Sequence, residues 1–262
     1  MPTPTQHVAI AAIALVAGAM NAIAGGGTLL LFPALIGLGV PSLIANATCT
    51  VAVWPGTLAA FLGYRAEWTA TRPWALRFLA PSVTGGLVGG VLLTITSQHT
   101  FDRIVPFLVL SATLMFVLQR PVLDALRRRQ GMGSPAAGPA RHPVPSGVFV
   151  VFHFFVAVYG GYFGGGIGMV MLAAFGLMGM TNIHQMNQLK MFCAMTYNLV
   201  AIGAFVIKGL VDWRLALTMA IGTTIGGWLA AGLAQRVPQV WVRGSVVVIG
   251  LSAGLWLLHT RA

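Results

Sequence analysis

The chain has 262 residues, of which 57% are hydrophobic and only 7% are charged. Soluble domains carry roughly 25% charged residues, so this composition excludes an ordinary soluble enzyme, a disordered chain and a nucleic-acid-binding domain. It predicts a polytopic membrane protein. The net charge of +11 lies on Lys and Arg residues between apolar segments, where the positive-inside rule explains it without a nucleic-acid partner.

The first half of the chain predicts one long interrupted element followed by three spans. Its apolar segments cover residues 8–38, 50–63, 76–95 and 104–118. The first is too long for a simple span, and Gly25–Gly27 interrupt it. Because each glycine destabilises a helix by about 1 kcal/mol, a helix break is predicted there. The element is either a broken helix that crosses the membrane or a re-entrant hairpin.

A polar segment without apolar periodicity then separates the two halves, from Gln119 to Ser146. We interpret it as a linker. The excess of Lys and Arg on one side of the membrane is the same in both topologies. The positive-inside rule therefore does not distinguish them. In both topologies, however, the charge bias predicts that this linker is cytoplasmic.

The second half repeats the pattern of the first. Its apolar segments cover residues 147–180, 191–207, 215–233 and 242–258, and Gly164–Gly166 interrupt the first of them. The chain is therefore predicted to be an all-α integral membrane protein with about eight hydrophobic segments.

The two halves match each other residue by residue at nearly constant spacing. The glycine triplets are 139 residues apart, and Asn46 and Asn187 are 141 apart. Gly85 and Gly226 are also 141 apart. Several matches in the same order indicate an internal duplication, a plan common in secondary transporters. The predicted units are a first transmembrane repeat at 1–118, the linker at 119–146 and a second repeat at 147–262.

The two breaks are the first candidate binding elements. A break at membrane depth survives only where the backbone is buried or lines a cavity, and it creates a helix N-terminus that attracts anions. The alternative is small-residue packing between helices. The candidate substrate-binding residues here are Gly25, Gly26, Gly27, Thr28, Gly164, Gly165 and Gly166.

The second element of each half begins with polar residues that could bind an oxyanion, and Thr50, Thr57 and Tyr197 belong to the same polar pattern. Lys190 could neutralise a bound anion, or its side chain could extend to the membrane interface. The candidate substrate-binding residues in this group are Asn46, Thr48, Asn187, Gln188, Lys190 and Asn198.

The distribution of titratable residues favours an anionic substrate. All four acidic residues lie in connecting segments, whereas sodium sites and proton relays usually need an intramembrane carboxylate. His153 is the one ionisable group deep in a span and could carry a proton during transport. The alternative is a histidine that packs between helices. No metal-ligand spacing is present, and neither a cofactor nor an enzymatic activity is predicted.

Several motifs resemble the sulfite exporter TauE/SafE family, also described as toluene sulfonate uptake permeases. In the first half these are GxxNAIAGGGTLLLFPALIGLG, PxxxANAT and YRxEW, and in the second half GGYFGGGIGMVML, KGLVDWRLAL and GGWLAAGLAQRV. The resemblance covers nearly the whole chain apart from the linker. It implies a bacterial inner-membrane permease for small sulfur-containing anions, with Asn46, Thr48, Asn187 and Lys190 on the pathway.

Together these observations predict a multi-pass secondary transporter of the bacterial inner membrane. It exports sulfite or an organosulfonate by alternating access at a midplane site between the repeats. The alternatives are a passive anion channel and a permease for a carboxylate. The expected partners are the small anion and the lipid bilayer, and the sequence is also compatible with a homo-oligomer.

Overall fold

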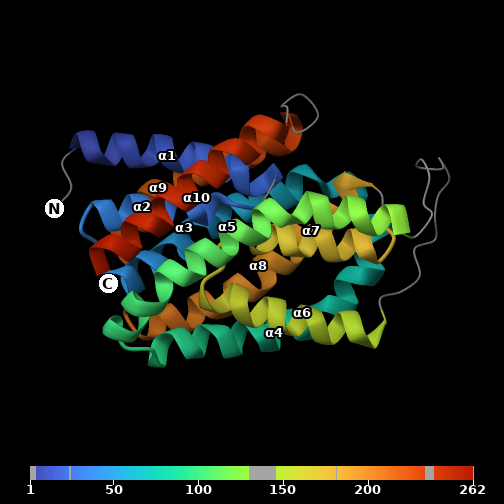
Figure 1. The fold of residues 1–262 in the computed structure, drawn as a ribbon, viewed down its shortest axis with the longest axis horizontal. Helices are drawn as coiled ribbons and strands as arrows, with labels where there is room; N and C mark the ends of the chain where they lie inside the picture. Colours follow the sequence, from blue (N-terminus) through green and yellow to red (C-terminus); the bar gives the residue numbers. More distant parts are fainter. Residues whose placement is uncertain (1–3, 24, 130–145, 181, 234–238, 262) are drawn as a thin grey trace.

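The computed structural model describes residues 4–23, 25–129, 146–180, 182–233 and 239–261, and the regular elements in these ranges are all helical (Figure 1). The helices of the first half are α1 (Pro4–Ile23), α2 (Gly27–Gly37), α3 (Ser42–Gly63), α4 (Trp68–Ile95) and α5 (Gln98–Arg129), with a 3₁₀ turn, η1, at Arg65–Glu67. Those of the second half are α6 (Gly147–Tyr162), α7 (Ile167–Leu177), α8 (Ile183–Ile207), α9 (Trp213–Leu233) and α10 (Gln239–Arg261).

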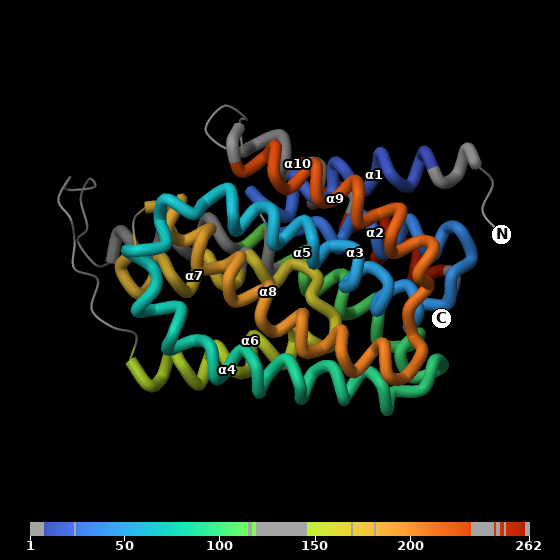
Figure 2. Tube along the Cα trace, turned by 180° about the vertical axis from the view of Figure 1, so that it is seen from behind, coloured from blue at the N-terminus to red at the C-terminus, as the bar shows by residue number. Residues whose placement is uncertain are grey.

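The first hairpin consists of α1 and α2, which the predicted glycine break separates. Gly25 has a φ of +84°, a conformation that costs little only for glycine, and the chain reverses there. The following helix, α3, begins beside the start of α5, where Ser42 Oγ donates a hydrogen bond to Asp102 Oδ1 at 2.5 Å. Figures 1 and 2 show that α2 returns to the end at which both termini lie. We call this the terminal end.

The second hairpin, formed by α6 and α7, enters from the opposite end, where α5 ends and α6 begins (Figure 2). We call this the linker end. Its glycines Gly164 and Gly166 have φ values of +72° and +74°, so the chain reverses here as well. After the return, Tyr64 and His184 place the start of α8 beside the end of α3, with ring centroids 6.0 Å apart. The structure therefore has two helical hairpins that enter the bundle from opposite ends, the arrangement expected of the re-entrant alternative.

The helices of each half pack mainly on helices of the other half. α1 packs along α9 as α6 packs along α4, and α3 packs on α9 as α8 packs on α4. α5 packs on α10, and α3 on α8. Glycines make these approaches close: a Cβ on Gly86 would lie 2.5 Å from the Tyr197 carbonyl oxygen. These pairings interlock the two halves, and the internal duplication stays a prediction.

The second helix of each half is longer than its apolar segment. α3 begins at Ser42 and α8 at Ile183, so Asn46 and Asn187 lie inside helices. α5 likewise continues to Arg129, past Gln119 where the sequence predicts the linker to begin. Among the described residues, three helical segments are long and apolar enough to cross a membrane, namely Ser42–Gly63, Arg65–Ile95 and Ile183–Ile207.

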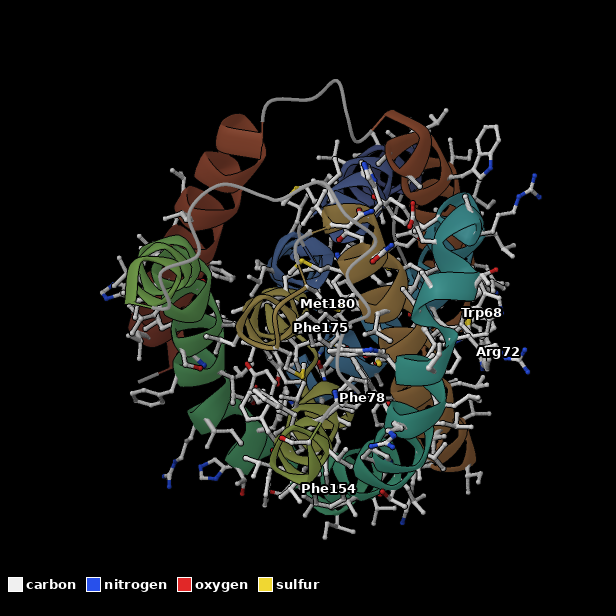
Figure 3. The ribbon with its side chains drawn as sticks, turned by 90° about the vertical axis from the view of Figure 1, so that its right-hand side faces the viewer. Trp68, Arg72, Phe78, Phe154, Phe175 and Met180 are labelled. Atoms are coloured by element: carbon white, nitrogen blue, oxygen red, sulfur yellow. The ribbon has the colours of Figure 1, made fainter. Side chains whose placement is uncertain are left out.

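α4 carries large apolar side chains on its outer face as well as on its inner face, as expected for a helix beside lipid. Figure 3 looks along the bundle from the linker end and shows Arg72 pointing away from it. Phe78 faces inward, and its ring centroid lies 6.0 Å from that of Phe175 on α7. Leu76 and Leu87, by contrast, are at least half exposed. Exposed leucines on an outer face suit a hydrocarbon environment.

Candidate functional site

The tips of the two hairpins meet in the interior of the protein. A Cβ on Gly25 would lie 2.6 Å from the Gly168 Cα, and a Cβ on Gly168 would lie 2.7 Å from the Gly25 Cα. Both values are far below ordinary van der Waals contact, so the two backbones touch where only glycine fits. Hairpins that enter from opposite ends therefore converge on one point.

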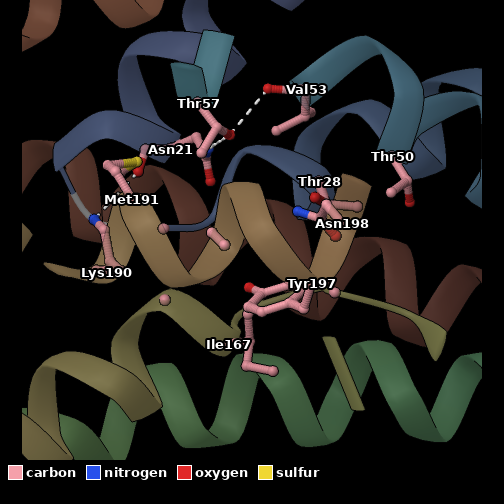
Figure 4. Close-up of a pocket in the computed structure, with 14 residues that line it drawn as sticks. Asn21, Thr28, Thr50, Val53, Thr57, Ile167, Lys190, Met191, Tyr197 and Asn198 are labelled. Carbon is pink, nitrogen blue, oxygen red and sulfur yellow. Dashed lines mark hydrogen bonds between the residues drawn. The ribbon is translucent and has the colours of Figure 1, made fainter. Parts of the chain in front are cut away.

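A cavity opens beside this contact, between the two tips and helices α3 and α8 (Figure 4). The space between its atoms measures about 430 Å³ with its open mouth included. Its lining residues come from both halves: Asn21, Gly25, Thr28, Thr50, Val53, Thr57, Gly164, Ile167, Gly168, Lys190, Met191, Ala194, Tyr197 and Asn198. Many form pairs at the offsets predicted from the sequence, such as Gly25 with Gly164 and Thr57 with Asn198.

Lys190 is the one charged side chain among these lining residues, and it is only 1% exposed. Its Nζ donates hydrogen bonds to the carbonyl oxygens of Asn21 and Ala22 at 3.3 Å and to Asn187 Oδ1 at 2.8 Å. The two carbonyls belong to the last turn of α1, the negative end of the helix dipole. The ammonium group therefore stabilises the broken end of the first hairpin. This burial excludes extension of the side chain to the membrane interface.

Two helix N-termini, the positive ends of helix dipoles, begin at this cavity. α2 starts after Gly26 and α7 after Gly166, and neither glycine can cap its helix with a side chain. The first N–H groups of a helix have no intrahelical acceptor. These ends and Lys190 place positive groups beside the cavity, and the last carbonyls of α1, which Lys190 binds, place negative ones there too.

Three polar side chains that line the cavity make no hydrogen bond to any described residue: Thr28 at the start of α2, and Tyr197 and Asn198 on α8. Asn21, by contrast, donates from Nδ2 to Thr57 Oγ1 at 3.1 Å, and that hydroxyl in turn donates to the Val53 carbonyl oxygen at 3.0 Å. Thr28 and Asn198 thus remain able to bind an oxyanion by hydrogen bonds.

The structure brings five of the predicted residues together in the cavity: Gly25, Thr28, Gly164, Lys190 and Asn198. Gly26, Gly27, Gly165 and Gly166 lie in the adjoining hairpin tips, and Asn187 reaches the cavity only through Lys190. The remaining three are buried elsewhere.

Those three residues hold helix ends or helix junctions. Asn46 Nδ2 donates to the Tyr162 carbonyl oxygen at 2.8 Å, and Thr48 Oγ1 accepts from the Asp212 N–H at 3.0 Å. The Gln188 amide faces the carbonyl oxygens of Phe61 and Tyr64, with its nitrogen as the donor once the amide is turned. These contacts favour a structural role for Thr48 and Gln188, and they hold the Asn46 amide at the end of α6.

Asn21, Thr50, Thr57 and Tyr197 also line the cavity. Sequence reasoning missed Asn21, which lies one helical turn before the first glycine triplet. Thr50, Thr57 and Tyr197 belong to the polar pattern that predicts oxyanion donors, and Thr57 is the partner of Asn198 at the offset of 141. No local signal identifies the apolar lining residues.

His153 lies outside this cavity. It is 3% exposed, its Nε2 is 2.8 Å from Ser82 Oγ, and its ring centroid is 4.6 Å from that of Phe78. It lines a smaller apolar cavity between α4, α6 and α7, together with Met171 and Phe175. This position favours packing between helices, and proton carriage by His153 stays a prediction.

Several relatives of this chain carry the name of a probable membrane transporter protein. The chain is 27% identical over 238 residues to a probable membrane transporter protein of Haemophilus influenzae, covering 90% of this chain and 88% of the relative. It is 24% identical to the probable membrane transporter protein YfcA of Escherichia coli K12 (94% and 87% covered) and 25% to ORF9 of Sinorhizobium sp (94% and 89% covered). No solved structure matches the chain.

These relatives and the spanning helices identify a membrane transporter rather than an enzyme. The family model for the sulfite exporter TauE/SafE matches residues 10–257, which is nearly the whole chain. The chain therefore belongs to the sulfite exporter TauE/SafE family, as its sequence motifs indicate.

Proposed function

We propose that the protein is a secondary transporter that exports a small sulfur-containing anion, sulfite or an organosulfonate, across the bacterial inner membrane. One observation carries this proposal. Two hairpin tips from opposite ends meet at a cavity, and Lys190 is the one charged residue among its lining residues. The name of the family supports the substrate class.

The cavity favours an anion over a cation for electrostatic reasons. None of its lining residues is acidic, so a cation would lose its hydration shell without a compensating charge. An oxyanion would instead accept hydrogen bonds from Thr28, Asn198 and the first N–H groups of α2 and α7. Lys190 would provide the countercharge from beneath, while it holds the end of α1.

The opposed hairpins supply a basis for alternating access. Each tip reaches the cavity from a different end of the protein, and the glycines of the two tips are in contact. A rocking movement of the helix group α1, α3 and α9 against the group α4, α6 and α8 would open one tip while the other stays closed. The cavity itself would remain at the centre throughout.

The basic residues support an orientation with the linker end in the cytoplasm. Arg65, Arg72 and Arg77 lie at or near the start of α4, at the linker end. Lys208 and Arg214 lie at the other end, between α8 and α9. The C-terminal part of α5 adds Arg120, Arg127, Arg128 and Arg129 to the linker end, and an excess of Lys and Arg is typical of cytoplasmic loops.

The test is flux of radiolabelled sulfite in proteoliposomes, with sulfoacetate, thiosulfate, sulfate, chloride and a carboxylate as competitors. We expect saturable uptake that sulfonates inhibit and carboxylates do not. Competition only by carboxylates would replace the substrate class but keep the transporter. Absence of flux for every anion, with folded protein shown by size-exclusion chromatography, would refute the proposal.

A passive anion channel is the second candidate, because the same cavity could conduct ions. A channel would give single-channel currents and a flux that does not saturate. We expect neither, because backbone contact between the hairpin tips obstructs a continuous pore.

A further inference from the structure

α3 and α8 are corresponding helices of the two halves, and one difference between them changes the local charge. At the offset of 141 residues, Asn46 corresponds to Asn187, and Cys49 corresponds to Lys190. In the second half, the lysine ammonium group joins Asn187 Oδ1 to the last carbonyls of α1. The first half has the same amide beside the end of α6 but a thiol in place of the ammonium group.

The consequence is an unpaired oxygen at the end of the second hairpin helix. Asn46 Nδ2 donates to the carbonyl oxygen of Tyr162, the last residue of α6, so the amide lies at that helix end. Asn46 is fully buried, and its Oδ1 has no hydrogen-bond partner among the described residues. Cys49 is also fully buried and uncharged in its thiol form. A buried polar atom of this kind is costly unless something binds it.

We propose that Asn46 Oδ1 and the C-terminal carbonyl oxygens of α6 bind a monovalent cation, Na⁺, in the place that corresponds to the Lys190 ammonium group. The end of a helix is the negative end of its dipole and leaves its last carbonyls without intrahelical donors. In transporters with broken helices, such ends coordinate Na⁺. A sodium ion and an ammonium group are both monovalent cations that attract amide and carbonyl oxygens.

The available ligands select a monovalent ion. No group of three His, Cys, Asp or Glu residues able to hold a metal occurs in the described part of the chain. Uncharged oxygens alone would compensate a divalent ion poorly. The sequence disfavours sodium because no carboxylate lies within a span, but an amide oxygen and a helix end supply ligands without one.

This inference deepens the proposed function, on which it rests for its role in transport. Lys190 stabilises the end of α1 permanently, whereas an ion at the end of α6 can leave. Binding and release of Na⁺ would then change the stability of one hairpin only, and this would couple transport to a sodium gradient.

Ion binding is tested first without any substrate, by thermal unfolding of the purified full chain in detergent. We expect NaCl to raise Tm in a saturable manner, and choline chloride at equal concentration to have no such effect. Asn46→Ala should lose this increase. Asn187→Ala, the matched amide beside Lys190, should keep it. An increase that persists in Asn46→Ala, or no increase in the wild type, would overturn the proposal.

A second pair of variants asks whether a fixed charge replaces the ion. Cys49→Lys should be insensitive to Na⁺ and as stable without Na⁺ as the wild type is with it. Cys49→Met adds bulk without charge and should be less stable than the wild type in both salts. Sodium sensitivity retained by a folded Cys49→Lys protein would contradict the inference, and if that variant does not fold, the Asn46 and Asn187 pair decides alone.

Transport then separates this inference from the proposed function. Sulfite flux in proteoliposomes should increase with an imposed Na⁺ gradient in the wild type but not in Asn46→Ala. If Tm responds to Na⁺ while no sulfite moves, the ion site stands and the substrate proposal fails. If sulfite moves with no Na⁺ effect on either flux or Tm, the ion site fails and the proposed function stands.

Discussion

Replacement of Gly168 by alanine tests the contact between the hairpin tips. The added methyl group would lie 2.7 Å from the Gly25 Cα and 3.2 Å from Lys190 Cδ. The nearer atom is backbone and cannot rotate away, so overpacking should cost about 2 kcal/mol. Alanine also gains roughly 0.7 kcal/mol over glycine in a helix, so the net destabilisation should be about 1.3 kcal/mol.

This energy has two measurable effects. Tm should fall by roughly 3 to 5 °C. If the tips touch in a state that every transport cycle visits, flux at subsaturating substrate should fall about tenfold, since 1.4 kcal/mol is one factor of ten. Thermal unfolding in detergent and proteoliposome flux measure the two effects.

Gly203→Ala is the matched control within a helix of the same half. A Cβ on Gly203 meets no atom within 4 Å, so this variant should gain the helix preference of alanine without the clash. It should raise Tm slightly and leave flux unchanged. A Gly168→Ala protein with wild-type Tm and flux would refute the close packing of the tips.

Three further predictions concern the cavity and the orientation of the chain. Lys190→Met should reduce sulfite flux at least tenfold, because three acceptors lose a charged donor. The control Lys208→Met, at the end of α8, should leave flux unchanged. Equal flux in both variants would show that Lys190 is not part of the site. Asn198→Leu should raise the half-saturating sulfite concentration about fivefold, because the loss of one hydrogen bond costs roughly 1 kcal/mol. An unchanged half-saturating concentration would show that this amide does not contact the substrate. Finally, Ser97→Cys, at the terminal end, should react with a membrane-impermeant thiol reagent in intact cells, and Ala66→Cys, at the linker end, should not. Both native cysteines are buried and should add little background labelling. The reverse labelling pattern would show the opposite orientation.

The sequence by itself determined the class of protein and the positions of its breaks. A composition with 7% charged residues permits little other than a membrane protein, because too few polar groups remain to cover a soluble surface. The glycine triplets predicted both helix breaks, since the backbone preference of glycine is local and needs no tertiary partner. Five predicted residues line the cavity, among them Thr28 and Lys190.

Only the tertiary structure decided the direction of the hairpins and the partners of the polar residues. A helix that crosses and one that returns have the same local sequence and nearly the same charge bias, so the choice rests on packing against the other half. Asn46 and Asn187 likewise look alike in sequence. Their environments differ because one lies beside Lys190 and the other beside Cys49, against helix ends more than a hundred residues away. Hydrogen bonds between such distant segments depend on the assembled fold, and local residue patterns do not specify them.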